Sequence, residues 1–176
     1  MTTPQDSDSD RFDRIERNME RISDDVKRIS DDMAVMKGWQ TELVVERRAR
    51  AIFRRLCGGN LLRIYPDAEL QHYIGYHRHI GIMSEEEFIR AGSADFLLEG
   101  TDSRGAAVMY ALEVSYTVGV DDSDRAIDKA ALLTRALGRE VRPAVVGETA
   151  TAQFEADAAS RNVAYAYIGN GRDILR

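Results

Sequence analysis

The 176-residue sequence has a single cysteine, Cys57, and this limits its chemistry. One thiol can form no disulfide within the chain and cannot build a zinc site by itself. No apolar stretch follows the acidic N-terminus MTTPQDSDSD, so a secretory leader is not expected. No apolar run is long enough to span a bilayer. We therefore expect a cytoplasmic protein with no membrane association.

Positive charge is not in excess either. The chain has 24 Lys and Arg against 30 Asp and Glu, which gives a formal net charge of −6. This balance argues against a protein that coats nucleic acid through general basicity. A local basic groove remains compatible with it, because electrostatic steering depends on where charges lie and not on their sum. The apolar content of 44% and the length suit one domain with a real core plus an appendage.

The N-terminal segment has the pattern of a coiled coil. Residues 1–10 are acidic and almost free of apolar side chains, which predicts a disordered tail. Over residues 11–40 apolar positions then recur at steps of three and four for about four heptads. In this register the a and d positions are Phe12, Ile15, Met19, Ile22, Val26, Ile29, Met33 and Met36.

One heptad of this seam is copied, since RISDDVK is followed directly by RISDDMA. The narrow apolar seam with polar residues all round favours a coiled-coil homo-oligomer, and a helix packed on its own domain is the alternative. The flanking e and g side chains are short or acidic and specify register weakly. They include Glu16, Asn18, Asp25, Asp32 and Lys37.

A second helix is expected after Gly38 and Trp39, which interrupt the seam, and it should end at Cys57-Gly58-Gly59. This stretch is rich in arginine. The basic residues are either a solvated face balanced by Glu42 and Glu46 or a local strip for a phosphate backbone. They are Arg47, Arg48, Arg50, Arg54 and Arg55.

Residues 94–118 read as a β-hairpin. Apolar residues occupy every even position from Val108 to Val118, and a turn signal lies between Gly100 and Gly105. A hairpin folded near Ser103 and Arg104 places Asp95 across from Ala111 or Glu113. Two carboxylates can then meet on one face of the sheet, which is the best functional clue in the chain.

The remaining elements complete a mixed-sheet α/β domain over residues 41–176. We expect strands at 60–65, 141–146 and 163–168, the last two reached by strand–helix–strand crossovers and therefore parallel. Helices are expected from Ser84 to about 92, from residues 121–124 to Gly138, and over 151–159. Residues 68–83 give no clear assignment. They contain all three histidines, which we interpret as ordinary surface or packed residues.

This order of elements, with Asp95 on the second strand and Glu113-Val114-Ser115 on the third, resembles the PD-(D/E)XK nuclease superfamily, the restriction-endonuclease-like fold. The likeness covers roughly residues 41–146. ALEVSYTVGVDDSDRAIDKA in particular is similar to uncharacterised bacterial members that join an N-terminal coiled coil to an αβββαβ core. The resemblance implies hydrolysis of phosphodiester bonds in DNA or RNA at a Mg²⁺ or Mn²⁺ site held by Asp95 and Glu113.

The resemblance also assigns the other candidate residues. The third motif position, about 6.6 Å further along the strand than Glu113, is normally lysine and here is Ser115. Lys129 and Arg125, on the next helix, are the nearest substitutes for the missing cation. Glu46, or Glu42, resembles an additional metal carboxylate, and Arg47, Arg54 and Arg125 are candidate nucleic-acid contacts. A catalytically inactive, homo-oligomeric binding module with the same fold is the alternative, and a pure assembly protein is a third possibility.

Overall fold

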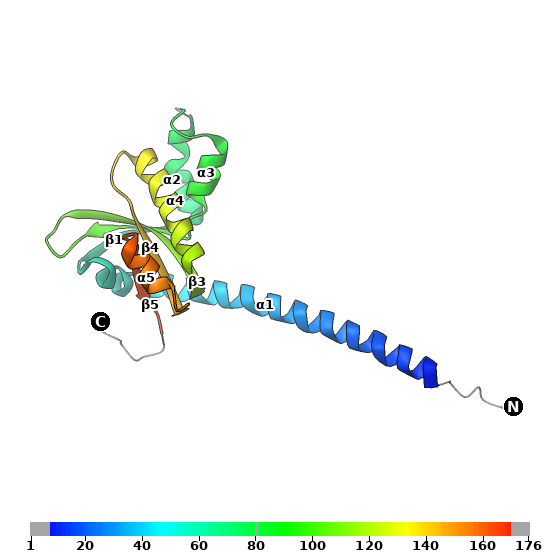
Figure 1. Ribbon diagram of the computed structural model, residues 1–176. Helices are drawn as coiled ribbons and strands as arrows, with labels where there is room; N and C mark the ends of the chain where they lie inside the picture. The colour runs from blue at the N-terminus through cyan, green and yellow to red at the C-terminus, as the bar shows by residue number, and fades with distance from the viewer. Residues whose placement is uncertain (1–7, 80, 170–176) are drawn as a thin grey trace. The chain divides into compact units, whose positions relative to one another are not determined.

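The computed structural model describes residues 8–79 and 81–169 (Figure 1). The chain forms two compact units, Met1–Lys37 and Gly38–Arg176. One helix, α1 (Asp8–Cys57), runs through the boundary. It corrects two expectations, because residues 8–10 of the predicted tail are helical and Gly38 and Trp39 do not break the helix. A single glycine in a helix interior costs only about 1 kcal/mol, which strong helix formers on either side can offset. Residues 1–7 of the predicted tail lie outside the described residues.

The second unit is built on one five-stranded mixed sheet in the order β1-β2-β3-β4-β5. The strands are β1 (Asn60–Pro66), β2 (Phe96–Thr101), β3 (Ala107–Val118), β4 (Arg142–Ala150) and β5 (Ala164–Tyr167). The first three are antiparallel, and β4 and β5 continue the sheet in parallel with β3. The predicted hairpin and the two parallel crossovers are therefore confirmed.

The hairpin register follows the apolar alternation. Phe96 pairs with Leu112 and Leu98 with Tyr110. Continuing that register by one residue brings Asp95 opposite Glu113, one of the two partners expected from the turn. A one-residue slip would move every side chain to the other face, so the buried apolar set fixes this pairing.

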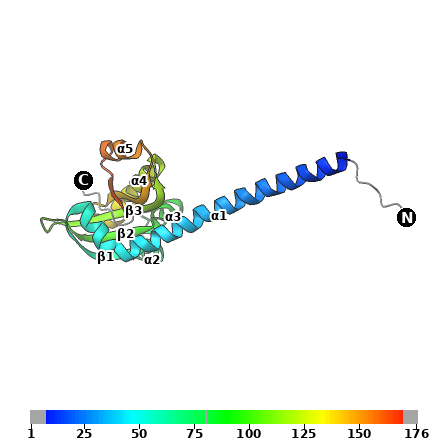
Figure 2. The ribbon, with the colours of Figure 1, turned by 90° about the horizontal axis from the view of Figure 1, so that it is seen from below.

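Helices cover both faces of the sheet. On one face, α2 (Asp67–His79), α3 (Glu85–Gly92) and α4 (Val120–Leu137) pack on the odd-numbered side chains Leu97, Met109 and Ala111 (Figure 1). On the other, Val45, Ile52 and Phe53 of α1 meet the even-numbered Leu98, Tyr110 and Leu112 (Figure 2). A third cluster joins α4 to α5 (Phe154–Ser160).

The helices begin and end largely where local signals place them. Ser84 caps α3 in a reciprocal capping box with Glu87, as its sequence predicts. The N-cap of α4 is Gly119 instead of the aspartates at 121–124, and Gly138 ends the helix with a φ of 65°. Helix α2 occupies the stretch that had no assignment. None of the described helices is long and apolar enough to cross a membrane.

Candidate functional site

The buried carboxylate Glu113 is the centre of a charged cluster on β3. Only 3% of Glu113 is exposed. Lys129 Nζ donates to its Oε1 at 2.6 Å, and Arg125 Nε donates to its Oε2 at 3.1 Å. The two cations are four residues apart on α4 and so share one face of that helix. The parallel crossover lays this first half of α4 over β3, which brings both cations to one carboxylate.

Lys129 is itself held in place. Its Nζ also donates to the main-chain oxygen of Ser93 at 2.8 Å, in the segment between α3 and β2. The residue is 8% exposed. A buried ammonium needs paired and hydrogen-bonded surroundings to remain charged, and the two oxygens supply them. Lys129 thus links α4 to β3 and to the segment that precedes β2.

Asp95 lies beside this ion pair. Its Oδ2 accepts the main-chain N–H of Val114 at 2.6 Å, which fixes the carboxyl next to Glu113. Burial raises the pKa of Asp95 to about 7, and the negative charges of Glu113 and Glu42 add to the shift. The Val114 hydrogen bond and Lys129 act in the opposite direction. Asp95 lies one residue before β2 instead of on the strand as expected, and it competes with Glu113 of β3 for the same positive charge.

The N-terminus of α4 adds a further carboxylate. Asp122 is 6% exposed, its Oδ2 accepts the N–H of Gly119 at 2.7 Å, and its Oδ1 accepts from Arg125. Arg125 thus bridges Asp122 and Glu113 while half of its side chain stays exposed. The cluster holds three carboxyl groups against two cations. When all are ionised, it carries an excess of negative charge.

This donor set has the chemistry that a hard divalent cation requires. Mg²⁺ is commonly held by one or two carboxylates while it keeps several of its waters. Asp95 and Glu113 are such a pair, and their mutual repulsion is what a dication would relieve. Among the described residues, no group of three or more His, Cys, Asp or Glu side chains is arranged to hold a metal ion.

The structure separates the other predicted residues from this cluster. Ser115 Oγ donates to the main-chain oxygen of Thr117 at 3.0 Å, a local contact within its own strand. Glu46 is exposed, whereas Glu42, one turn earlier on α1, is half-buried and is the α1 carboxylate whose charge acts on Asp95. Burial also raises the pKa of Glu42. Of the two α1 carboxylates considered from the sequence, the geometry favours Glu42.

The candidate nucleic-acid residues fall into two groups. Arg47 and Arg54 are exposed on α1. Arg125 belongs to the buried cluster, through which its guanidinium is already paired. Among the histidines, His72 is exposed on α2, and the side chains of His77 and His79 lie outside the described residues.

Asp122 and Ser93 are the members of the cluster that sequence reasoning missed. The run Asp121-Asp122-Ser123-Asp124 reads as a helix cap, and Asp122 does accept the N–H of Gly119. Its spacing of three residues from Arg125 was the available signal for an ion pair. Ser93 contributes a main-chain oxygen, which no sequence pattern marks.

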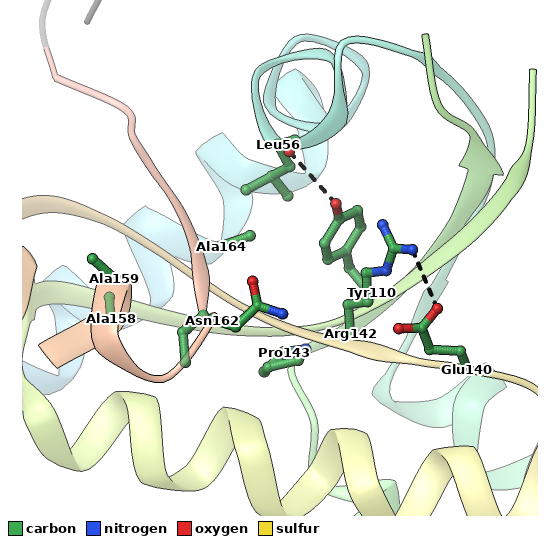
Figure 3. Close-up of a pocket in the computed structure, with 10 residues that line it drawn as sticks. Leu56, Tyr110, Glu140, Arg142, Pro143, Ala158, Ala159, Asn162 and Ala164 are labelled. Atoms are coloured by element: carbon green, nitrogen blue, oxygen red, sulfur yellow. Dashed lines mark hydrogen bonds and ion pairs between the residues drawn. The ribbon is translucent and has the colours of Figure 1, made fainter. Parts of the chain in front are cut away.

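A separate cavity of about 340 Å³ lies among residues of α1, β3, β4 and the segment from α5 to β5 (Figure 3). It is lined by Leu56, Tyr110, Arg142 and Asn162 among others. Arg142 pairs with Glu140 at 3.2 Å. The cavity contains none of the predicted site residues and has no carboxylate pair of the kind found at Asp95 and Glu113.

No family model matches the chain, and neither a curated protein nor a solved structure gives a match.

Proposed function

We propose that this chain is a metal-dependent, nuclease-like protein that hydrolyses phosphodiester bonds of nucleic acid at Asp95, Glu113 and Lys129. The observation that carries the proposal is the 2.6 Å contact between Lys129 Nζ and Glu113 Oε1, with Asp95 beside it. A lysine next to paired carboxylates restores the cation that is missing at Ser115.

The topology supports the restriction-endonuclease-like interpretation of the sequence. A helix is followed by three antiparallel strands, a helix and a strand parallel to the third, which is the αβββαβ order. Helices α2 and α3 are insertions between the first two strands. Fold alone assigns no activity, so the proposal depends on the charged cluster.

Asp95 and Glu113 would hold the divalent cation. Glu42 is the α1 carboxylate whose negative charge acts on Asp95, so it is the candidate for the additional metal carboxylate. A bound Mg²⁺ polarises a phosphoryl oxygen and acidifies water. The chain supplies the rest. The Val114 N–H orients Asp95, and Lys129 places a positive charge where negative charge develops on the phosphate. Exposed Arg47 and Arg54 offer contacts to the phosphate backbone.

A catalytically inactive binding module is the second candidate, and one observation favours it. Both oxygens of Glu113 are already engaged, one by Lys129 and one by Arg125. If neither cation yields to a metal ion, the cluster is a structural ion-pair network. Such a protein would bind nucleic acid through its exposed arginines without cleaving it.

The proposal is tested by incubating the full chain with duplex DNA, single-stranded DNA and RNA in Mg²⁺ or Mn²⁺, followed by electrophoresis. Lys129→Met removes the proposed cation, and Ser115→Ala is its matched control, because the Ser115 hydroxyl contacts only its own strand among the described residues. We expect cleavage by the native chain and by Ser115→Ala, and a loss of at least 100-fold in Lys129→Met.

Two results would contradict this expectation. Binding of nucleic acid without cleavage in either metal would favour the inactive module. Cleavage that survives in Lys129→Met but is lost in Ser115→Ala would show that Ser115, and not Lys129, fills the third motif position. Circular dichroism of each variant separates loss of activity from loss of fold.

A further inference from the structure

An unpartnered apolar stripe runs along the N-terminal part of α1. Its eight side chains, called the seam below, repeat at steps of three and four, and each is between 52% and 70% exposed. They are Phe12, Ile15, Met19, Ile22, Val26, Ile29, Met33 and Met36. Large apolar patches of this extent on a protein surface mark interaction sites.

We propose that the seam forms a coiled coil with the same segment of further copies of this chain. The repeat supplies the main argument, because a seam of period 3.5 closes only against helices of matching period. The heptad RISDDVK is followed directly by RISDDMA, so the apolar residues keep the same spacing over this part of the seam. A second copy is therefore a partner of the required shape that is always present.

Charge on the remaining faces is compatible with self-assembly. The e and g positions that flank the seam carry both signs, with Glu16, Asp25 and Asp32 against Lys37. Outside the seam, Arg28 already pairs with Asp25 of the same helix at 2.9 Å. Three of these four charges are acidic, and the Arg28–Asp25 pair within each helix compensates part of that excess when identical helices approach.

The seam also favours full overlap over a slipped alignment. The copied heptad permits two parallel helices to slide by seven residues and still match a with a and d with d. Such a slip would leave Phe12 and Ile15 of one chain, and Met33 and Met36 of the other, without partners. Each large apolar side chain left in water loses the stabilisation that burial gives, so the aligned assembly is preferred.

The inference does not rest on the proposed function, and its test uses neither metal nor nucleic acid. The mass of the full chain in EDTA is measured by light scattering after size exclusion, over a range of micromolar concentrations. Ile22→Lys/Ile29→Lys places charge at two d positions. Asp24→Asn/Asp31→Asn is the control, because it changes net charge equally at two outward f positions.

We expect the native chain and the control to have the mass of two or more chains. The seam variant should have the mass of a single chain. A monomeric native chain would overturn the inference, whether its seam folds back on the same chain or awaits a different protein. An unchanged multiple in the seam variant would overturn it as well, since assembly would then use another surface.

Discussion

Lys129 Nζ lies 2.6 Å from Glu113 Oε1 although the two residues are 16 positions apart, on α4 and β3. The contact exists because α4 packs back across the strand that precedes it. It gives the site a lysine from a helix instead of from the strand.

Breaking the pair should destabilise the fold strongly. In Lys129→Met, Glu113 stays buried with only the half-exposed Arg125 as a cation. Removing one partner of a buried ion pair costs about 3–5 kcal/mol. We expect a loss near the lower end of this range in urea unfolding, because Arg125 remains.

A double-mutant cycle provides the control for this effect. Glu113→Gln/Lys129→Met removes both charges. The double variant should therefore lose much less free energy of unfolding than the sum of the losses in the two single variants. Strictly additive losses would show that the contact contributes little coupling energy.

Asp95 should make stability depend on pH. The folded protein holds this proton up to about pH 7, whereas the unfolded chain releases it near 3.8. Between these values the folded state binds more protons, so the free energy of unfolding falls as pH rises, and the loss is complete above pH 7. Asp95→Asn removes this titration while its amide oxygen can still accept the Val114 N–H.

Unfolding in EDTA from pH 4 to pH 8 measures the difference between Asp95→Asn and the native chain. We expect the variant to gain stability relative to the native chain with rising pH, by up to about 4 kcal/mol in total. A difference that stays flat across this range would mean that Asp95 ionises at its ordinary pKa.

Gly100 should not tolerate a side chain. A Cβ there would lie 2.2 Å from the main-chain oxygen of Asn60 and 2.6 Å from the ring of Phe53. Gly100→Ala should therefore lower the melting temperature sharply, because β1 and α1 must both move. Gly38→Ala is the matched control, since its Cβ meets nothing within 4 Å and alanine favours the helix by about 1 kcal/mol. Equal melting temperatures for the two variants would contradict this packing.

Arg47 and Arg54 should contribute to nucleic-acid binding through phosphate contacts. Each contact removed lowers the slope of log K against log salt by about 0.9, so Arg47→Ala/Arg54→Ala should reduce the slope by about 2. Arg17→Ala/Arg21→Ala, with both arginines exposed on the N-terminal part of α1, is the control. Fluorescence anisotropy with a short duplex at several salt concentrations measures both. Equal slopes in all three proteins would place the binding surface elsewhere.

Sequence patterns predicted the hairpin and the crossovers because both depend on short-range rules. Alternation over Val108–Val118 fixes which residues are buried, and burial fixes the register that sets Asp95 opposite Glu113. The parallel crossover then brings the helix with Lys129 back over β3. The hairpin rules set Asp95 opposite Glu113, whereas Lys129 was a candidate only through the family resemblance.

The features that the sequence did not predict depend on tertiary packing or on small differences in helix stability. In α2 only Leu70 and Ile74 of the described side chains are fully buried, so little helical periodicity appears in the sequence. Glu42 and Glu46 lie one turn apart on α1, and only tertiary packing distinguishes them. Helix α1 continues through Gly38 because the residues on either side are helical enough to offset one glycine.

Calorimetric titration of the full chain with Mg²⁺ and Mn²⁺ measures the proposed metal site at Asp95 and Glu113 without assuming a substrate. We expect binding by the native chain and by Ser115→Ala, and its loss in both Asp95→Ala and Glu113→Ala. No heat of binding in the native chain, even with a non-cleavable duplex present, would contradict a metal site at these carboxylates. The cluster around Glu113 would then be an ion-pair network that holds α4 to the sheet.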